Sequence, residues 1–408
     1  MKIGAGVKML TLLLDIGTTT IKGSLLDKAT GREISSDFIL NEQVKFGEDV
    51  ITRIDFSLKS PKNADKLKFA ALKSINGLIK KLTKETPFKS SDIKEAIVVC
   101  NTAMHHLFLG LSAESLIRPP YKALEKAEMT IKAKEAGINI LQDAPVIILP
   151  NIGSFVGSDA IGVIIASNIY DSDSIKLAID IGTNGEIILG SSDKILVTST
   201  AAGPAFEGRC ISCGMPATAG AIEKVRIMKD GSVKSAVIGN ISPKGICGSG
   251  LIDTVAEMLK RGLIDKTGKM KSQSFVLFKK GNIKIFITQS DVRKLQLAKA
   301  AIYAGIKVLM RQLTIEASNI SRVLITGSFG NSINAKNAIL TGLIPRISPS
   351  KVEFVKDAPI KGAKRYILSK KIQSELTSIL SKVKRIPLAR KDFQQTYVDS
   401  MGFKGHNT

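Results

Sequence analysis

Two short stretches of the chain place an aspartate, a glycine and a threonine together where one apolar run ends and the next begins. The first is LLLDIGTTTIKGSLLD, from Leu12 to Asp27, and the second is LAIDIGTNGEIILG, from Leu177 to Gly190. In such a turn glycine lets the backbone approach a phosphate, while the amides and threonine hydroxyls donate to its oxygens. An aspartate at the strand end can hold Mg²⁺ through water, because this ion keeps most of its hydration shell. Two such turns that face each other would hold the phosphates of one nucleotide from both sides.

A third glycine turn follows later in the chain. The stretch VLITGSFGNS, from Val323 to Ser332, is an apolar strand that ends in glycine. Two phosphate turns followed by such a motif resemble the actin-like ATPases, a superfamily that includes actin, sugar kinases and the large heat-shock chaperones. The resemblance implies an α/β, actin-like ATPase fold in which two ribonuclease-H-like lobes close over ATP and Mg²⁺. The third motif would lie against the adenosine.

The hydrophobic pattern around these turns predicts the elements that position them. In each half the aspartate turn belongs to a meander of three strands, which GREISSDFIL completes in the first half and KILVTS in the second. Apolar residues at helical spacing predict helices over residues 65–85 and 290–313, and a further helix is expected near residues 369–383. The apolar runs IKEAIVVC and APVIILP are typical of buried central strands.

The repeated order of elements indicates an internal duplication and therefore two lobes. At 408 residues the chain is long enough for two or three domains, each with its own core. We expect residues 1–170 to form the first lobe, with the first phosphate turn. Residues 171–350 would form the second, with the second turn and the adenosine motif. Residues 351–408 are basic, and we expect them to pack on the second lobe.

Several longer blocks narrow the resemblance to one family. The blocks are NEQVKFGEDVITRI, NTAMHHLFLG, DIGTNGEI, AAGPAFEG, CGMPATAGAIEKV, ICGSGLID, QLAKAAIYAGI and GSFGNSINAKNAILTGLIP. They resemble the ATPase portion of the reductive activators of corrinoid proteins, over about residues 10–403. That family uses ATP to return an inactive Co(II) corrinoid to the methyl-accepting Co(I) state.

The resemblance assigns roles to individual residues. ATP and Mg²⁺ would be the ligands, with Asp15 and Asp180 facing the metal. Asp159 either orients the attacking water or only caps the helix that follows it, and Glu186 is the second candidate for a catalytic carboxylate. We also expect Gly327→Val to weaken ATP binding with little effect on stability. The residues placed on the nucleotide are Asp15, Gly17, Thr18, Thr19, Thr20, Asp180, Gly182, Thr183, Asn184, Gly185, Gly327, Ser328, Phe329 and Gly330.

The sequence differs from typical family members in the region that would carry electrons. Typical members carry an N-terminal ferredoxin-like domain with an iron–sulfur cluster, whereas this sequence starts directly at the ATPase portion. We therefore expect no iron–sulfur cluster in this chain and a separate ferredoxin-like electron donor. Cys210 and Cys213 form one Cys-x-x-Cys pair, which we interpret as two buried or idle thiols. Two protomers would supply four such thiols. An alternative therefore stays open, in which a homodimer holds a bridging cluster, as in activators of radical 2-hydroxyacyl-CoA dehydratases.

Composition limits the classes of partner. The net charge is +23, but the basic residues are spread along the chain, aromatic residues make up only 5%, and no nucleic-acid-binding module is present. We therefore expect no nucleic-acid partner. We also expect no membrane partner, because no apolar run approaches the length of a membrane span. The expected location is cytoplasmic. The expected partner is a corrinoid protein or a corrinoid-dependent methyltransferase.

Two further functions remain open on the same fold. A small-molecule kinase would transfer phosphate to an acceptor, and an actin-like assembly protein would polymerise with ATP. A shared metal at the neighbouring His105 and His106 is not expected, because adjacent residues of a helix point in different directions. We assign these two histidines to the core or to an interface.

Overall fold

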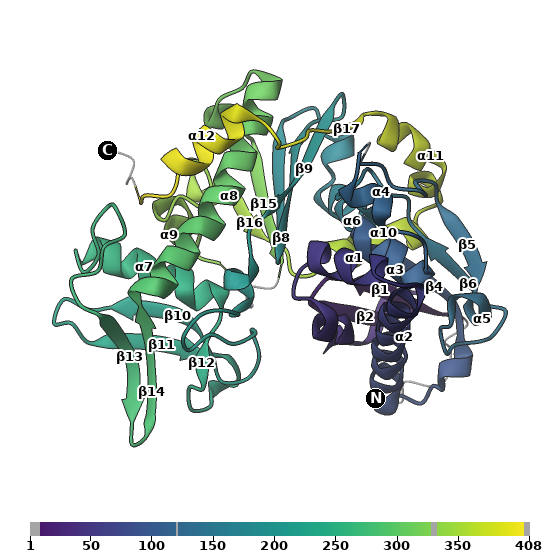
Figure 1. Cartoon of the computed structure of the whole chain (residues 1–408), viewed down its shortest axis with the longest axis horizontal. Coiled ribbons are helices and arrows are strands. Elements are labelled where there is room, and N and C mark those ends of the chain that lie inside the picture. Colours follow the sequence, from purple (N-terminus) through teal and green to yellow (C-terminus); the bar gives the residue numbers. More distant parts are fainter. Residues whose placement is uncertain (1–8, 120, 328–332, 404–408) are drawn as a thin grey trace. The chain divides into compact units, whose positions relative to one another are not determined.

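The computed structural model describes residues 9–119, 121–327 and 333–403, which form two units (Figure 1). The first unit takes the chain up to Tyr170 together with Asp357–Arg385. The second takes Asp171–Lys356 together with the chain from Ile386 onward. Each unit is built around its own β-sheet and its own buried apolar residues.

The sheet of the first unit has the strand order β3-β2-β1-β4-β6-β5. Strand β1 pairs antiparallel with β2 and parallel with β4, and its Leu12, Leu13 and Leu14 side chains are fully buried. Elements cover both faces of a central strand of this kind, so its apolar residues run without alternation. The strands are β1 (Leu10–Ile16), β2 (Thr20–Asp27), β3 (Arg32–Leu40), β4 (Ile93–Cys100), β5 (Met129–Lys132) and β6 (Pro145–Ile148).

Helix α2 (Pro61–Lys84) confirms the amphipathic helix expected over residues 65–85. The Ser60 hydroxyl accepts from the Asn63 amide at 3.2 Å, and proline stands in the first turn, where its missing N–H is not needed. The buried face of α2 packs against β2 and β3. The other helices of this unit are α1 (Val50–Leu58), α3 (Thr102–Leu109), α4 (Glu114–Ile117), α5 (Ala133–Ala136), α6 (Ser158–Ser167), α10 (Ala358–Leu368) and α11 (Lys370–Ser381).

The expected packing of residues 351–408 on the second lobe is wrong for the middle of that segment. Residues 357–385 belong to the first unit, because α10 packs against α6. The Arg365 guanidinium fixes this contact: it donates to the Ile165 carbonyl at 2.6 Å and to the Asn168 side chain at 2.9 Å, at the C-terminal end of α6. A cation there is also favoured by the helix dipole. The chain returns to the second unit after the short strand β17 (Val383–Arg385).

The sheet of the second unit repeats the arrangement of the first. Strands β16, β15, β7, β8 and β9 lie side by side in that order, with β7 antiparallel to β8 and parallel to β15. The three strands that follow from the second aspartate turn therefore form the predicted meander. Their bounds are β7 (Lys176–Ile181), β8 (Asn184–Gly190), β9 (Ile195–Ala201), β15 (Arg322–Gly327) and β16 (Val352–Phe354).

An additional layer of small sheets stands between β9 and β15 in the sequence. One is a three-stranded sheet with the order β11-β10-β12, and the other is the hairpin β13-β14. Helix α7 (Gly248–Lys260) packs on β10. The sequence analysis did not predict these strands. Their bounds are β10 (Ala221–Ile227), β11 (Val233–Val237), β12 (Gly245–Ile246), β13 (Ser274–Lys280) and β14 (Ile283–Thr288).

Helix α8 (Gln289–Leu313) confirms the helix expected over residues 290–313. Its start is set by a capping box, in which the Thr288 hydroxyl and the Asp291 carboxylate each accept from the other's backbone amide. One side of α8 packs on β8 and β9, and α12 (Lys391–Asp399) lies along another side (Figure 1). The remaining helix is α9 (Ala335–Leu340). Among the helices that the structure describes, none is long and apolar enough to cross a membrane.

Candidate functional site

The first aspartate turn connects β1 to β2 and consists of Gly17, Thr18 and Thr19. The Gly17 amide donates to the Thr20 carbonyl at 3.1 Å, which closes the turn. A Cβ atom on Gly17 would lie only 2.6 Å from that carbonyl oxygen, so this position requires glycine. The backbone of the turn itself therefore requires this glycine.

Two buried asparagines hold this turn in place, and neither was among the predicted site residues. The Asn41 side chain donates to the Gly17 carbonyl at 2.9 Å, and its backbone amide donates to the Thr19 carbonyl at 2.9 Å. The Asn101 side chain donates to the Thr18 hydroxyl at 3.1 Å. Asn41 follows β3 and Asn101 follows β4, and each opens one of the blocks that carry the family resemblance. The position of each asparagine directly after a strand was the sequence signal that could have identified it as a site residue.

Asp15 and Asp159 both lie near Cys100, the last residue of β4. Asp15 is the penultimate residue of β1, and Asp159 stands in the first turn of α6. Burial raises the pKa of the Cys100 thiol, and the Asp159 and Asp15 carboxylates raise it further, so both charges act on the end of β4. One Asp159 oxygen accepts from the Ala160 amide at 2.8 Å, while the N-cap of α6 is Gly157. Asp159 thus interacts with the first turn of α6 without being its N-cap residue.

The second aspartate turn connects β7 to β8 through Gly182 and Thr183 alone. The Gly182 amide donates to the Asn184 carbonyl at 2.9 Å. The Thr183 amide donates to one oxygen of Glu207 at 3.0 Å, and the Thr183 hydroxyl donates to the other at 3.1 Å. In this structure a carboxylate therefore occupies the two Thr183 donors that we expected to bind phosphate. Glu207 lies in the block AAGPAFEG, but its contact with the turn could not be read from the sequence.

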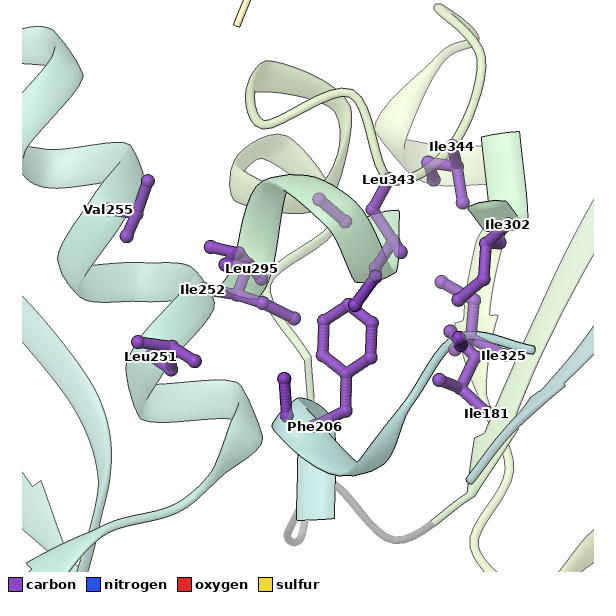
Figure 2. Close-up of a cluster of buried hydrophobic side chains, with 14 of the residues drawn as sticks. Ile181, Phe206, Leu251, Ile252, Val255, Leu295, Ile302, Ile325, Leu343 and Ile344 are labelled. Carbon is purple, nitrogen blue, oxygen red and sulfur yellow. The ribbon is translucent and has the colours of Figure 1, made fainter. Parts of the chain in front are cut away.

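The backbone next to Glu207 is anchored by its neighbour Phe206. The short 3₁₀ helix Pro204–Glu207 carries the Phe206 ring into the core of the second unit, where it is 1% exposed. Figure 2 shows the ring among side chains of α7, α8 and the sheet, including Leu251, Ile302 and Ile325. Burial of the ring therefore holds the backbone next to Glu207 in place.

Glu186 stands directly opposite Asp180 in the antiparallel pair of β7 and β8. Residues opposite one another in such a pair share a face of the sheet, and like charges there cost free energy. Glu186 is 6% exposed and accepts from the Ser199 hydroxyl at 3.1 Å. Two neighbouring carboxylates at the end of a strand are a donor set that suits a hard cation.

Gly327, the last residue of β15, lies beside the second turn. It is opposite Ile181 in the parallel pair of β15 and β7, and its φ is 127°. A Cβ atom at Gly327 would lie 2.1 Å from the Ile181 carbonyl oxygen. The expectation that Gly327→Val would have little effect on stability is therefore wrong, because any side chain there collides with β7. Ser328, Phe329 and Gly330 lie outside the described residues.

The Cys-x-x-Cys pair and the two neighbouring histidines lie outside these turns; both histidines are fully buried, and the ring nitrogens of His105 have no hydrogen-bond partner among the residues that the structure describes. Cys210 is exposed and Cys213 is partly buried, and both are free thiols. The His106 Nε2 accepts from the Leu124 amide at 3.1 Å, so its Nδ1 carries the proton and donates to the Thr102 carbonyl at 2.8 Å. Burial lowers the pKa of His105 to about 4. Within the described ranges, no group of three or more His, Cys, Asp or Glu residues is arranged to hold a metal ion.

Family models match nearly the whole chain. The model described as the C-terminal domain of RACo, the ASKHA domain, matches residues 174–408, and the model of the RACo middle region matches residues 10–172. The chain belongs to the RACo family. Its fold is accordingly that of the actin-like ATPases, as the two aspartate turns and the glycine motif predicted.

Characterised relatives of this family are similar over most of the chain. The corrinoid activation enzyme RamQ of Eubacterium limosum is 35% identical over 95% of this chain and 69% of its own length. The [Co(II) methylated amine-specific corrinoid protein] reductase of Methanosarcina barkeri is 26% identical over 92% of this chain and 73% of its own. A solved structure of a reductive activator for corrinoid, iron–sulfur protein has a TM-score of 0.93 and 37% identity, and covers 99% of this chain and 67% of that one.

Proposed function

We propose that this protein uses ATP to drive the reduction of a Co(II) corrinoid protein to its Co(I) state. The observation that carries the proposal is the family membership of a chain that has both aspartate turns intact. Relatives at 35% and 37% identity are named for activation of corrinoid proteins, and the similarity covers at least 95% of this chain. The corrinoid is the substrate, and it is carried by a separate partner protein.

In this proposal the two turns bind the phosphates of ATP, and Asp15 and Asp180 hold Mg²⁺. Two features support these ligands: the Asn101 side chain donates to the Thr18 hydroxyl in the first turn, and Asp180 stands opposite a second carboxylate, Glu186. When bound, Mg²⁺ neutralises phosphate charge. The Thr18 hydroxyl is already oriented by Asn101, so the first turn needs little reorganisation to donate to an oxyanion.

The second turn needs a change before it can donate to phosphate. Each Thr183 donor has a single proton, and both are engaged by Glu207. We propose that the phosphate displaces the Glu207 carboxylate, since two anions cannot share these donors without strong repulsion. Glu207 then competes with the nucleotide, and the buried Phe206 keeps the backbone of the 3₁₀ helix in place during the exchange.

Hydrolysis requires a carboxylate that orients the attacking water. Asp159 is the first candidate, because its charge and that of Asp15 act on the same thiol at the end of β4. Glu186 is the second, because it is opposite Asp180. Phosphoryl transfer of this type needs positioning and charge stabilisation and no covalent protein intermediate.

ATP can supply free energy to the reduction but not the electron itself. A nucleotide changes the partner's redox equilibrium only if the protein binds that partner differently in its nucleotide states. The electron would come from a ferredoxin-like donor.

The decisive experiment is anaerobic absorbance spectroscopy of a cognate Co(II) corrinoid protein. With the chain and a low-potential reductant, Co(I) should form when ATP and Mg²⁺ are present and not when ATP is left out. Equal Co(I) formation with and without ATP would remove the proposal. Transfer of labelled phosphate to a small acceptor molecule would show instead that the protein is a kinase.

The same proposal predicts that Asp15→Ala and Asp180→Ala each abolish Mg²⁺-dependent ATP hydrolysis while the protein stays folded. Asp193→Ala is the matched control, because this aspartate is exposed in the turn between β8 and β9. Full turnover in either test variant, with an unchanged circular dichroism spectrum, would show that the turn concerned does not act on ATP.

A further inference from the structure

Helix α8 presents a stripe of polar side chains that takes no part in the aspartate turns. Lys299, Tyr303, Lys307 and Arg311 follow one another at steps of four residues. Residues four apart on a helix are neighbours on its surface. The stripe extends over about 18 Å, since each residue of a helix rises about 1.5 Å. The sequence alone would suggest a solvated helix face.

In the structure this stripe forms one wall of a cavity. Helix α12 and the residues after it form the opposite wall, and Thr341 and Gly342, which follow α9, form the end. The cavity has a volume of about 340 Å³, which is within the range of pockets that bind small molecules. All of its lining residues belong to the second unit.

Lys299 is the deepest charged group of the cavity. It is 2% exposed, and its ammonium donates to the Ser400 carbonyl and, at 2.6 Å, to the Gly402 carbonyl. It also lies over the Phe403 ring, 5.2 Å from the centroid. No carboxylate pairs with it among the residues that the structure describes, and burial lowers its pKa to about 8. A buried ammonium without a counter-ion costs free energy, and an anion in the cavity would offset that cost.

The other polar groups of the stripe have donors to spare. Within the described ranges, neither the Lys307 ammonium nor the Tyr303 hydroxyl is engaged in a hydrogen bond or an ion pair. Arg311 donates to the Thr396 hydroxyl at 2.9 Å, which leaves most of the five N–H groups of its guanidinium available. The cavity is lined by three cationic side chains, those of Lys299, Lys307 and Arg311, and by one carboxylate, that of Asp399. The lining is therefore cationic overall.

We propose that this cavity is a binding site for a small phosphate-bearing polyanion. Three cations and a tyrosine hydroxyl on one stripe match an elongated ligand whose anionic oxygens are spread over several positions. Phosphate groups provide such oxygens, and both lysine and arginine bind them through charge-assisted hydrogen bonds. The site is separate from the aspartate turns, because none of the turn residues lines it.

The test is calorimetric titration of tripolyphosphate into the full chain at fixed physiological ionic strength. The double variant Lys307→Ala/Arg311→Ala should bind at least about tenfold more weakly than the wild type, because it removes two charge-assisted contacts. The matched control is Lys279→Ala/Lys280→Ala, which changes the net charge equally at exposed residues of β13. The control should bind as the wild type does, and citrate should bind much more weakly than tripolyphosphate.

Three results would overturn the proposal. Equal losses in the two double variants would mean that tripolyphosphate responds only to net charge. Wild-type affinity in Lys307→Ala/Arg311→Ala would mean that it binds elsewhere, for instance at the aspartate turns. Citrate that binds as tightly as tripolyphosphate would exclude phosphate as the recognised group. Thermal melting checks the fold of each variant, and the single variant Lys307→Ala provides the same comparison if the double variant does not fold.

Discussion

Replacing Glu207 with glutamine tests whether this carboxylate competes with the nucleotide at the second turn. Glu207 accepts from the Thr183 amide at 3.0 Å and from the Thr183 hydroxyl at 3.1 Å. Glutamine keeps the length and shape of the side chain, but it has no charge and only one acceptor oxygen. Glu207→Gln therefore weakens the arrangement in which this side chain occupies the two Thr183 donors, which we call the closed arrangement of the turn, and it leaves no cavity.

The magnitude follows from the two hydrogen bonds. A hydrogen bond to a charged group contributes about 1.5–3 kcal/mol and a neutral one about 0.5–1.5 kcal/mol. Glu207 is half-buried, so solvent screens part of this difference, and the closed arrangement should lose about 1–2 kcal/mol. The apparent affinity of a ligand increases with the fraction of protein in the competent state, so ATP should bind roughly 5- to 30-fold more tightly. The loss of repulsion between carboxylate and phosphate acts in the same direction.

The assay is calorimetric titration with the Mg²⁺ complex of a non-hydrolysable ATP analogue. Glu316→Gln is the matched control, since Glu316 is an exposed carboxylate of the same unit. The melting temperature of Glu207→Gln should stay close to that of the wild type, because the Phe206 anchor is untouched. Weaker binding in Glu207→Gln would show that the carboxylate positions the turn for ATP. Unchanged binding would show that the Thr183 donors are not used by the phosphates.

Three more variants test the geometry. Gly327→Ala should lower the free energy of unfolding in urea by about 3 kcal/mol, because φ is 127° and the added Cβ meets the Ile181 carbonyl oxygen; wild-type stability would contradict this. Asn101→Ala should cost about 1–2 kcal/mol and weaken ATP binding, since it removes the N-cap of α3 and the contact with the Thr18 hydroxyl. The free energy of unfolding of the wild type should rise by up to about 3 kcal/mol between pH 8 and pH 10.5, and Lys299→Met should not show this rise. In that range the unfolded lysine holds a proton that the folded one has released, so urea melts of both proteins across it should diverge.

The sequence by itself predicted the parts of the fold that depend on local pattern. Apolar runs and helical periodicity placed β1, β4, α2 and α8 within a few residues of their bounds. The two Asp-Ile-Gly-Thr turns were predictable for the same reason, because a tight turn after a buried strand needs glycine wherever the rest of the chain goes. At Gly17 that requirement is visible, since a Cβ atom would meet the Thr20 carbonyl of the same turn.

Contacts between distant segments were decided by tertiary structure. The amphipathic helix α10 could pack on either core, and only its fit against α6 places residues 357–385 in the first unit. Glu207 reaches Thr183 because the Phe206 ring is buried among α7, α8 and the sheet, and nothing in the order of residues 183–207 requires that. Likewise, steps of four residues set Lys299, Lys307 and Arg311 on one stripe of α8, but the return of α12 along that stripe makes it a cavity. Local geometry acts over a few residues, whereas these contacts depend on which apolar surfaces bury each other once the whole chain has folded.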